Sequence, residues 1–131
     1  MTTVGSLVYL FFEHHLKAEK GLSQASIRSY RDGIRLFLHF MAETTGHPIS
    51  KLALSDLNVE NVRAFLTHLE GRRGNNIRSR NHRLAMLHTF FAYVGGQAPE
   101  LLHQAERVAA IPRKRAQPPA TQAAPWKGRW T

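Results

Sequence analysis

Apolar residues recur at steps of three and four along most of the chain, and this spacing predicts amphipathic helices. No segment alternates apolar and polar residues in the two-residue period of a strand. The predicted helices run from Val4 to about Gly21, from Ser23 to about Thr45, from Asn58 to about Gly71, from Ile77 to Gly95-Gly96, and from Pro99 to about Ala109. The pattern therefore predicts an all-α fold of four to five helices.

Residues that start and stop helices support these boundaries. Ser23 and Asn58 are good N-caps, and Pro99 suits the first position of a helix. Gly21 is suited to the residue that follows a helix, and Pro48 disfavours helical backbone just before it. The helical period and the end signals thus agree.

Between the second and third helices lies a loop, residues 49–57, whose leucines we expect in the core. They are Leu52, Leu54 and Leu57. The three tyrosines, Tyr9, Tyr30 and Tyr93, fall on or beside apolar faces, so we interpret them as packing residues. The stretch 112–131 is rich in proline and reads as an extended or disordered tail after a domain of residues 1–111. The role of Trp126 and Trp130 in that tail stays open.

The charge points to a polyanionic partner. Lysine and arginine number 18 against 9 acids, a formal net charge of +9, and such a field attracts nucleic acid. The absence of cysteine excludes disulfides and thiolate metal sites. No histidine and carboxylate spacing indicates a metal, and no phosphate-binding loop or nucleophile motif occurs. We therefore expect no cofactor and no membrane segment, and we expect a cytoplasmic protein.

One side of the second helix is a row of cations. Because each helical residue advances about 100°, Gln24, Arg28, Arg31 and Arg35 fall within an arc of about 60° beside the apolar face. Arginines at one-turn spacing suit consecutive phosphates, and arginine also reads guanine in the major groove. A solvated arginine face is the alternative interpretation.

The fourth helix begins with cations where a stable helix would place acids. Five arginines and no acid lie between residues 72 and 83. A helix N-terminus favours phosphate, and the short side chains of Ser79 and Asn81 are of the kind that contact phosphates or base edges. The misfit between charge and helix dipole suggests that function outweighs stability here.

Residues on four successive helices resemble one family. The stretches 22–37 and 79–93 resemble two signature helices of the core-binding domain of tyrosine recombinases, the phage-integrase family. Residues 54–57 and 62–66 match its usual connecting segment, and residues 111–115 are similar to a linker toward the catalytic domain. The resemblance covers about residues 5–111.

The resemblance implies a SAM-like fold whose second and fourth helices cross the major groove of double-stranded DNA. The implied contacts from the second helix are Ser23, Gln24, Ser26, Arg28, Arg31 and Arg35. Those from the fourth helix and the linker are Arg78, Ser79, Arg80, Asn81, Arg83, Arg113, Lys114 and Arg115. Arg80 and Arg83 lie nearer the apolar arc than Arg78 does.

The sequence departs from the family in having no counterpart of its catalytic domain. No tyrosine follows Tyr93 and no histidine follows His103, so we expect a DNA binder that is not an enzyme. Truncation or a frameshift of a longer gene is the simplest explanation of this ending. Two alternatives stay open: a helical module that binds an intact recombinase or itself, and a functionless remnant of a mobile element.

Overall fold

A computed structural model describes residues 2–71 and 77–115 and confirms the all-α prediction. The elements are α1 (Val4–Leu10), η1 (Phe11–Glu19), α2 (Gln24–Thr45), η2 (Ile49–Lys51), η3 (Leu54–Asp56), α3 (Val59–Gly71), α4 (Ile77–Gln97), η4 (Pro99–Leu101) and α5 (Leu102–Ala109). No strand occurs among these described residues.

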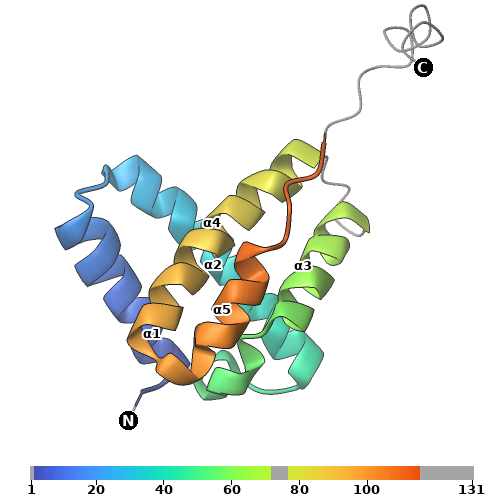
Figure 1. Cartoon of the computed structure of the whole chain (residues 1–131), viewed down its shortest axis with the longest axis horizontal. Coiled ribbons are helices and arrows are strands. Elements are labelled where there is room, and N and C mark those ends of the chain that lie inside the picture. The colour runs from blue at the N-terminus through green and yellow to red at the C-terminus, as the bar shows by residue number, and fades with distance from the viewer. Residues whose placement is uncertain (1, 72–76, 116–131) are drawn as a thin grey trace, which may run out of the picture.

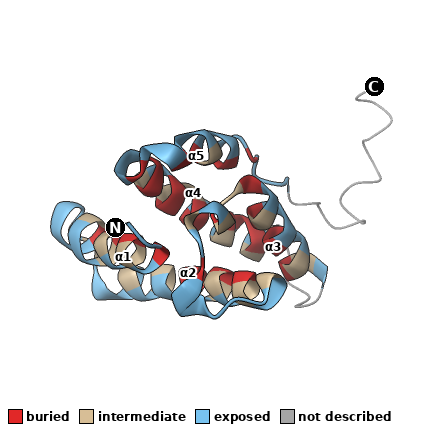
Figure 2. Cartoon of the chain, turned by 90° about the horizontal axis from the view of Figure 1, so that it is seen from below, coloured by how far each residue is buried: buried red, intermediate tan, exposed pale blue. Residues whose placement is uncertain are grey.

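Helix α4 lies at the centre of the bundle, as Figures 1 and 2 show. Helices α2, α3 and α5 and the η1 segment all pack on it. The core includes large aromatic side chains that are almost completely buried, among them Phe11, Phe37 and Phe90. Phe11 meets Phe90 edge to face at 5.1 Å, and Phe37 meets Phe65 at 5.3 Å. Each such side chain stabilises the fold by about 1.5–3 kcal/mol through burial alone.

The first helix changes its winding partway along. Helix α1 continues into η1, which is π-helical, so that the Lys20 N–H donates to the His15 carbonyl at 2.9 Å. Bonds between residues five apart bring Leu16 onto the face of Phe11, and both are buried. The sequence predicted an ordinary α-helix. The difference arises because Phe11 and Leu16 are five residues apart, and π-helical winding places residues at that spacing on the same face. Gly21 follows with a φ of +61°, as expected for the residue after a helix.

The predicted helix starts and the loop are confirmed. The Ser23 hydroxyl accepts from the Ser26 N–H at 3.2 Å, and the Asn58 side chain accepts from the Asn61 N–H at 2.8 Å. In the loop, which forms the short turns η2 and η3, Leu52 and Leu57 are buried and Leu54 is half-buried.

The tyrosine prediction is right for two residues and wrong for one. Tyr30 packs edge to face with Phe11 at 5.9 Å, and Tyr93 stacks on His15 at 4.9 Å. Tyr9 instead is 62 % exposed. Its neighbours Val4, Leu7 and Phe11 fill the buried side of the helix, and Tyr9 lies off that side.

Helix α4 continues through the two glycines that the sequence interpreted as its end. Gly95 is buried, and a Cβ added there would lie 2.8 Å from the Cβ of Ala105 in α5. A Cβ added at Gly96 would meet nothing within 4 Å. Gly95 therefore allows α4 and α5 to approach closely, and Gly96 does not serve this purpose.

We predict opposite effects for alanine at these two neighbouring positions. Gly95→Ala should lower the free energy of unfolding by about 1–3 kcal/mol, because the added methyl group overpacks the contact with α5. Gly96→Ala should raise it by up to about 1 kcal/mol, because alanine favours helix. Urea denaturation of both variants measures the difference, and equal effects would contradict the close approach.

Candidate nucleic-acid interface

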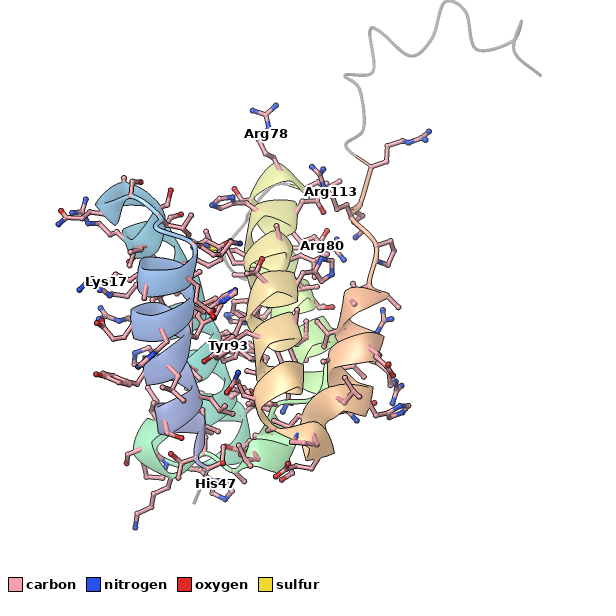
Figure 3. The ribbon with its side chains drawn as sticks, turned by 60° about the vertical axis from the view of Figure 1, so that its left-hand side comes forward. Lys17, His47, Arg78, Arg80, Tyr93 and Arg113 are labelled. Atoms are coloured by element: carbon pink, nitrogen blue, oxygen red, sulfur yellow. The ribbon has the colours of Figure 1, made fainter. Side chains whose placement is uncertain are left out.

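The first turns of α2 and α4 lie at the same edge of the molecule, at the top in Figures 1 and 3. The segment after α5, residues 110–115, runs back to this edge. Arg78 and Arg113 point away from the protein there, at the end opposite His47 (Figure 3). We call this part of the surface the basic edge: the first two turns of α2 and of α4, with residues 113–115.

The serines predicted at the start of α2 belong to its cap. The Ser23 hydroxyl accepts the Ser26 N–H and donates to the Ser26 hydroxyl, both at 3.2 Å. Both side chains remain exposed. The cap leaves both hydroxyl groups accessible from solvent.

The predicted row of α2 is present and exposed. Gln24, Arg28, Arg31 and Arg35 are all exposed. No ion pair joins any of the three guanidiniums to a carboxylate among residues 2–71 and 77–115. The row is therefore positively charged at the surface, and the nearby carboxylates of Glu13 and Asp32 form no ion pair with it.

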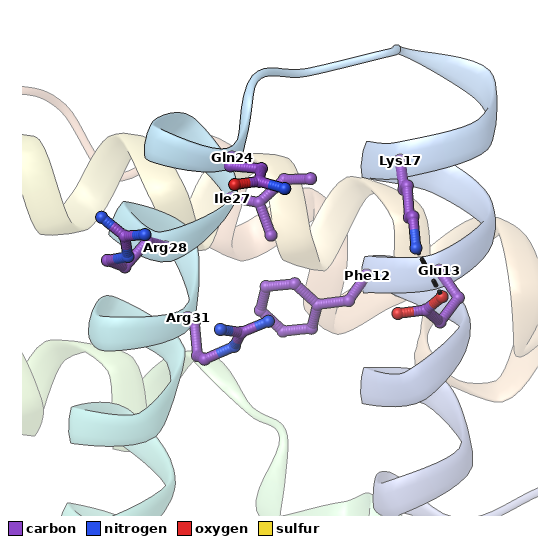
Figure 4. A pocket seen from close by; sticks show the side chains of 7 residues that line it. All are labelled: Phe12, Glu13, Lys17, Gln24, Ile27, Arg28 and Arg31. Atoms are coloured by element: carbon purple, nitrogen blue, oxygen red, sulfur yellow. Dashed lines mark ion pairs between the residues drawn. The ribbon is translucent and has the colours of Figure 1, made fainter.

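A hollow of about 270 Å³ adjoins this row (Figure 4). Gln24, Arg28 and Arg31 line one side of it, and Lys17 of η1 lines the other. Lys17 pairs with Glu13 at 3.6 Å, a contact four residues apart on the same helix. Lys17 was absent from the sequence prediction, because only the packing of η1 beside α2 brings it here.

The far end of the row adjoins apolar side chains. Arg31 and Arg35 flank a second hollow of about 220 Å³ whose lining includes Val8, Phe12 and Leu38. Arg35 also lies eleven residues from the first residue of α2, about 17 Å along the helix. Of the row, Arg35 thus lies furthest from the basic edge.

Helix α4 packs on the opposite side of α2 from the arginine row. A Cβ added at Gly33 would lie 2.7 Å from Met86 Sδ and 3.2 Å from Arg83 Nη1, so α2 and α4 approach closely there. Gly33 lies about 160° around the helix from Arg31 and Arg35. The starts of α2 and α4 thus lie at one edge, and Arg83 of α4 lies on the side of α2 opposite to Arg31 and Arg35.

The remaining polar residues of α4 differ in exposure. Arg78 is fully outside the core, Ser79 is half-buried, and Arg83 is half-buried along α2. His82 is exposed and its Nε2 lies 3.4 Å from the Ser29 hydroxyl of α2. Arg78 is therefore the most accessible cation at the start of α4.

Arg80 and Asn81, which the family resemblance implied as DNA contacts, are buried, as the place of Arg80 near the apolar arc already indicated. Their relative exposures are 8 % and 7 %, and both bond within the protein. Arg80 Nη1 donates to the Pro112 carbonyl at 3.1 Å and to Asn81 Oδ1 at 3.0 Å. Both side chains face the segment after α5, and helical periodicity does not predict a contact with that segment.

The linker cations also divide into two kinds. Arg113 and Arg115 are exposed and have no ion pair among the described residues. Lys114 pairs with Glu70 of α3, at 2.8 and 3.1 Å from its two carboxylate oxygens. The beginning of the predicted tail is thus tied to the bundle, whereas Trp126 and Trp130 lie outside the described residues.

Metal binding, titration and membrane insertion can each be judged for the described part of the chain. No group of three histidine or acidic side chains there could hold a metal ion. Burial, and secondarily the charge of Glu19, raises the pKa of Tyr93, which favours its neutral form. Of the helices described, none is both long and apolar enough to cross a membrane.

We predict that two arginines two residues apart differ strongly in their effect on stability. Arg80→Ala should lower the free energy of unfolding by about 2–3 kcal/mol, because it removes hydrogen bonds to a buried amide and to a backbone carbonyl. Arg78→Ala should change it by less than about 0.5 kcal/mol, because that side chain is solvated. Urea denaturation tests both, and a small loss for Arg80→Ala would contradict a structural role.

Comparison with known proteins identifies a family for this fold. Residues 11–95 match the family described as phage integrase, N-terminal SAM-like domain. The chain is 38 % identical over 113 residues to "Putative integrase/recombinase y4rC" and 36 % identical over 110 residues to "Putative integrase/recombinase y4rD", both of Sinorhizobium fredii (strain NBRC 101917 / NGR234).

These alignments cover 86 % and 84 % of this chain but 34 % and 39 % of the two relatives. The chain therefore spans little more than a third of the length of the curated relatives it matches. No solved structure matches it significantly. Since the family match covers residues 11–95, the chain belongs to the phage integrase N-terminal SAM-like domain family.

Proposed function

We propose that this domain binds double-stranded DNA through its basic edge, as the DNA-gripping arm of a recombinase. The observation that carries the proposal is the row of exposed α2 arginines, none of which pairs with a described carboxylate. Arg28 and Arg31 of this row belong to the basic edge, and Arg35 lies beyond it. Unpaired guanidiniums along one helix repel one another. A phosphate backbone would relieve that repulsion and release its own counterions.

The starts of two long helices add to this argument. Helices α2 and α4 have 22 and 21 residues, and neither has an acidic residue in its first turn. The positive end of each helix dipole favours phosphate at the edge where both helices begin. The +9 net charge of the chain raises the rate of encounter with DNA.

The proposed contacts follow from exposure and position. They are Ser23, Gln24, Ser26, Arg28 and Arg31 from α2, Arg78, Ser79 and Arg83 from α4, and Arg113 and Arg115 from the linker. Arg80 and Asn81 are not included, because they are buried and bond within the protein. Lys17 joins the set because it lines the same hollow as Arg28 and Arg31.

The proposal assigns binding, not strand cleavage, to these 131 residues. Transesterification requires a tyrosine placed against a phosphate that several cations activate. Tyr93 is stacked on His15 within the bundle, and its raised pKa disfavours the phenolate that a nucleophile requires. We therefore propose DNA binding, and not strand cleavage, as the activity of this part of the protein.

We predict that one arginine of the row changes the salt dependence of binding. Arg28→Ala should weaken binding to duplex DNA roughly fivefold, and the slope of log K against log salt should decrease in magnitude by about 1. Fluorescence anisotropy with a labelled duplex, repeated across salt concentrations, measures both quantities.

Arg63→Ala is the matched control, because it removes the same charge from an exposed position near the start of α3, which lies at the opposite edge. This variant should bind DNA with nearly the affinity and slope of the unmodified protein. Equal losses of affinity in the two variants would show that the effect depends only on net charge, not on the position of the arginine. No binding to any duplex at low salt, with the fold intact, would exclude the function.

A further inference from the structure

The side-chain amide of Asn81 bonds to both backbone groups of one linker residue, Lys114. Its Nδ2 donates to the Lys114 carbonyl at 2.7 Å, and its Oδ1 accepts from the Lys114 N–H at 2.8 Å. A side-chain amide used in this way replaces one rung of a sheet ladder. Because Asn81 is 7 % exposed, water competes little for these bonds.

Two further residues hold the same segment. Arg80 Nη1 donates to the Pro112 carbonyl at 3.1 Å and also to Asn81 Oδ1, so it orients the amide as well as the linker. Glu70 of α3 pairs with Lys114 at 2.8 Å and lies 4.0 Å from Arg80 Nε. We call Asn81, Arg80 and Glu70 the linker clamp.

The clamp grips alternate residues and leaves the others to solvent. Pro112 and Lys114 are held through their backbones, whereas the side chains of Arg113 and Arg115 are exposed. Arg113 points outward at the edge where Arg78 also points outward (Figure 3). An irregular segment rarely keeps such a course without partners, because fixing each residue costs about 1–2 kcal/mol of backbone entropy.

We propose that Asn81 is a positioning residue, which fixes residues 112–115 on α4 so that Arg113 and Arg115 extend the basic edge. The part of this proposal that concerns DNA rests on the proposed function. The order of the linker does not, and it can be measured without DNA.

The first experiment measures backbone order by ¹⁵N relaxation on the full chain. Arg113 and Arg115 should give order parameters near those of a rigid backbone, about 0.85, and Asn81→Ala should lower them below about 0.6. His82→Ala is the matched control, because its exposed neighbouring side chain does not reach the linker. Low order parameters in the unmodified protein would overturn the clamp.

A second pair of variants avoids the core of the bundle. Lys114→Pro removes the N–H that Asn81 accepts, whereas Lys114→Ala keeps this N–H and removes only the ammonium group. The backbone order parameter of Arg115 should fall much further in Lys114→Pro than in Lys114→Ala. Equal order in the two variants would show that the Asn81 bond does not hold the linker.

The third experiment tests whether the clamp serves DNA binding. Arg113→Ala should weaken binding to duplex DNA roughly fivefold in the unmodified protein and less than about twofold in Asn81→Ala, a coupling expected only if Asn81 positions Arg113. Equal losses in both backgrounds would overturn the positioning role. Failure of the unmodified protein to bind DNA would refute the proposed function, and the order parameters would then decide the clamp.

Discussion

The arrangement of this domain depends on how closely other helices approach α4. Two glycines set that distance, one in α2 where it meets α4 and one in α4 where it meets α5. At Gly33 of α2 an added Cβ would meet Met86 at 2.7 Å, and at Gly95 of α4 it would meet Ala105 at 2.8 Å. Because protein interiors are packed to crystal density, neither contact leaves room for a methyl group without movement. These approaches bring the starts of α2 and α4 to one edge and return the chain after α5 to it (Figure 1).

The basic residues of α4 separate into two tasks that look alike in the sequence. Arg78 is exposed, whereas Arg80 is buried against the linker. A buried arginine is costly unless its donors find acceptors. Here Nη1 of Arg80 donates to a backbone carbonyl and to an amide oxygen, whereas its buried Nε has no hydrogen-bond partner and lies 4.0 Å from the Glu70 carboxylate. The unusual charge at this helix start is thus explained in part by structure, and the remainder by the proposed contact with DNA.

Much of the fold could be predicted from the sequence, because it follows from local rules. The caps at Ser23 and Asn58 and the helical periods need only neighbouring residues. The π-helical winding of η1 was missed although its signal, the five-residue step from Phe11 to Leu16, is local. The passage of α4 through Gly95 could not be predicted, because the close contact that Gly95 allows is with Ala105 of another helix. For the same reason the arginine row was predictable from one helix, whereas Lys17, Glu70 and the role of Asn81 required the packing of several elements.

DNA binding through the basic edge is tested most directly by titrating the ¹⁵N-labelled chain with a DNA duplex and following the chemical shifts of the backbone amides. If the basic edge binds DNA, the chemical shifts should change most at residues 23–31, 77–83 and 113–115 and little at residues 46–51 of the opposite edge (Figure 3). Changes centred on residues 46–51, or shifts spread evenly over the surface, would contradict binding through the basic edge.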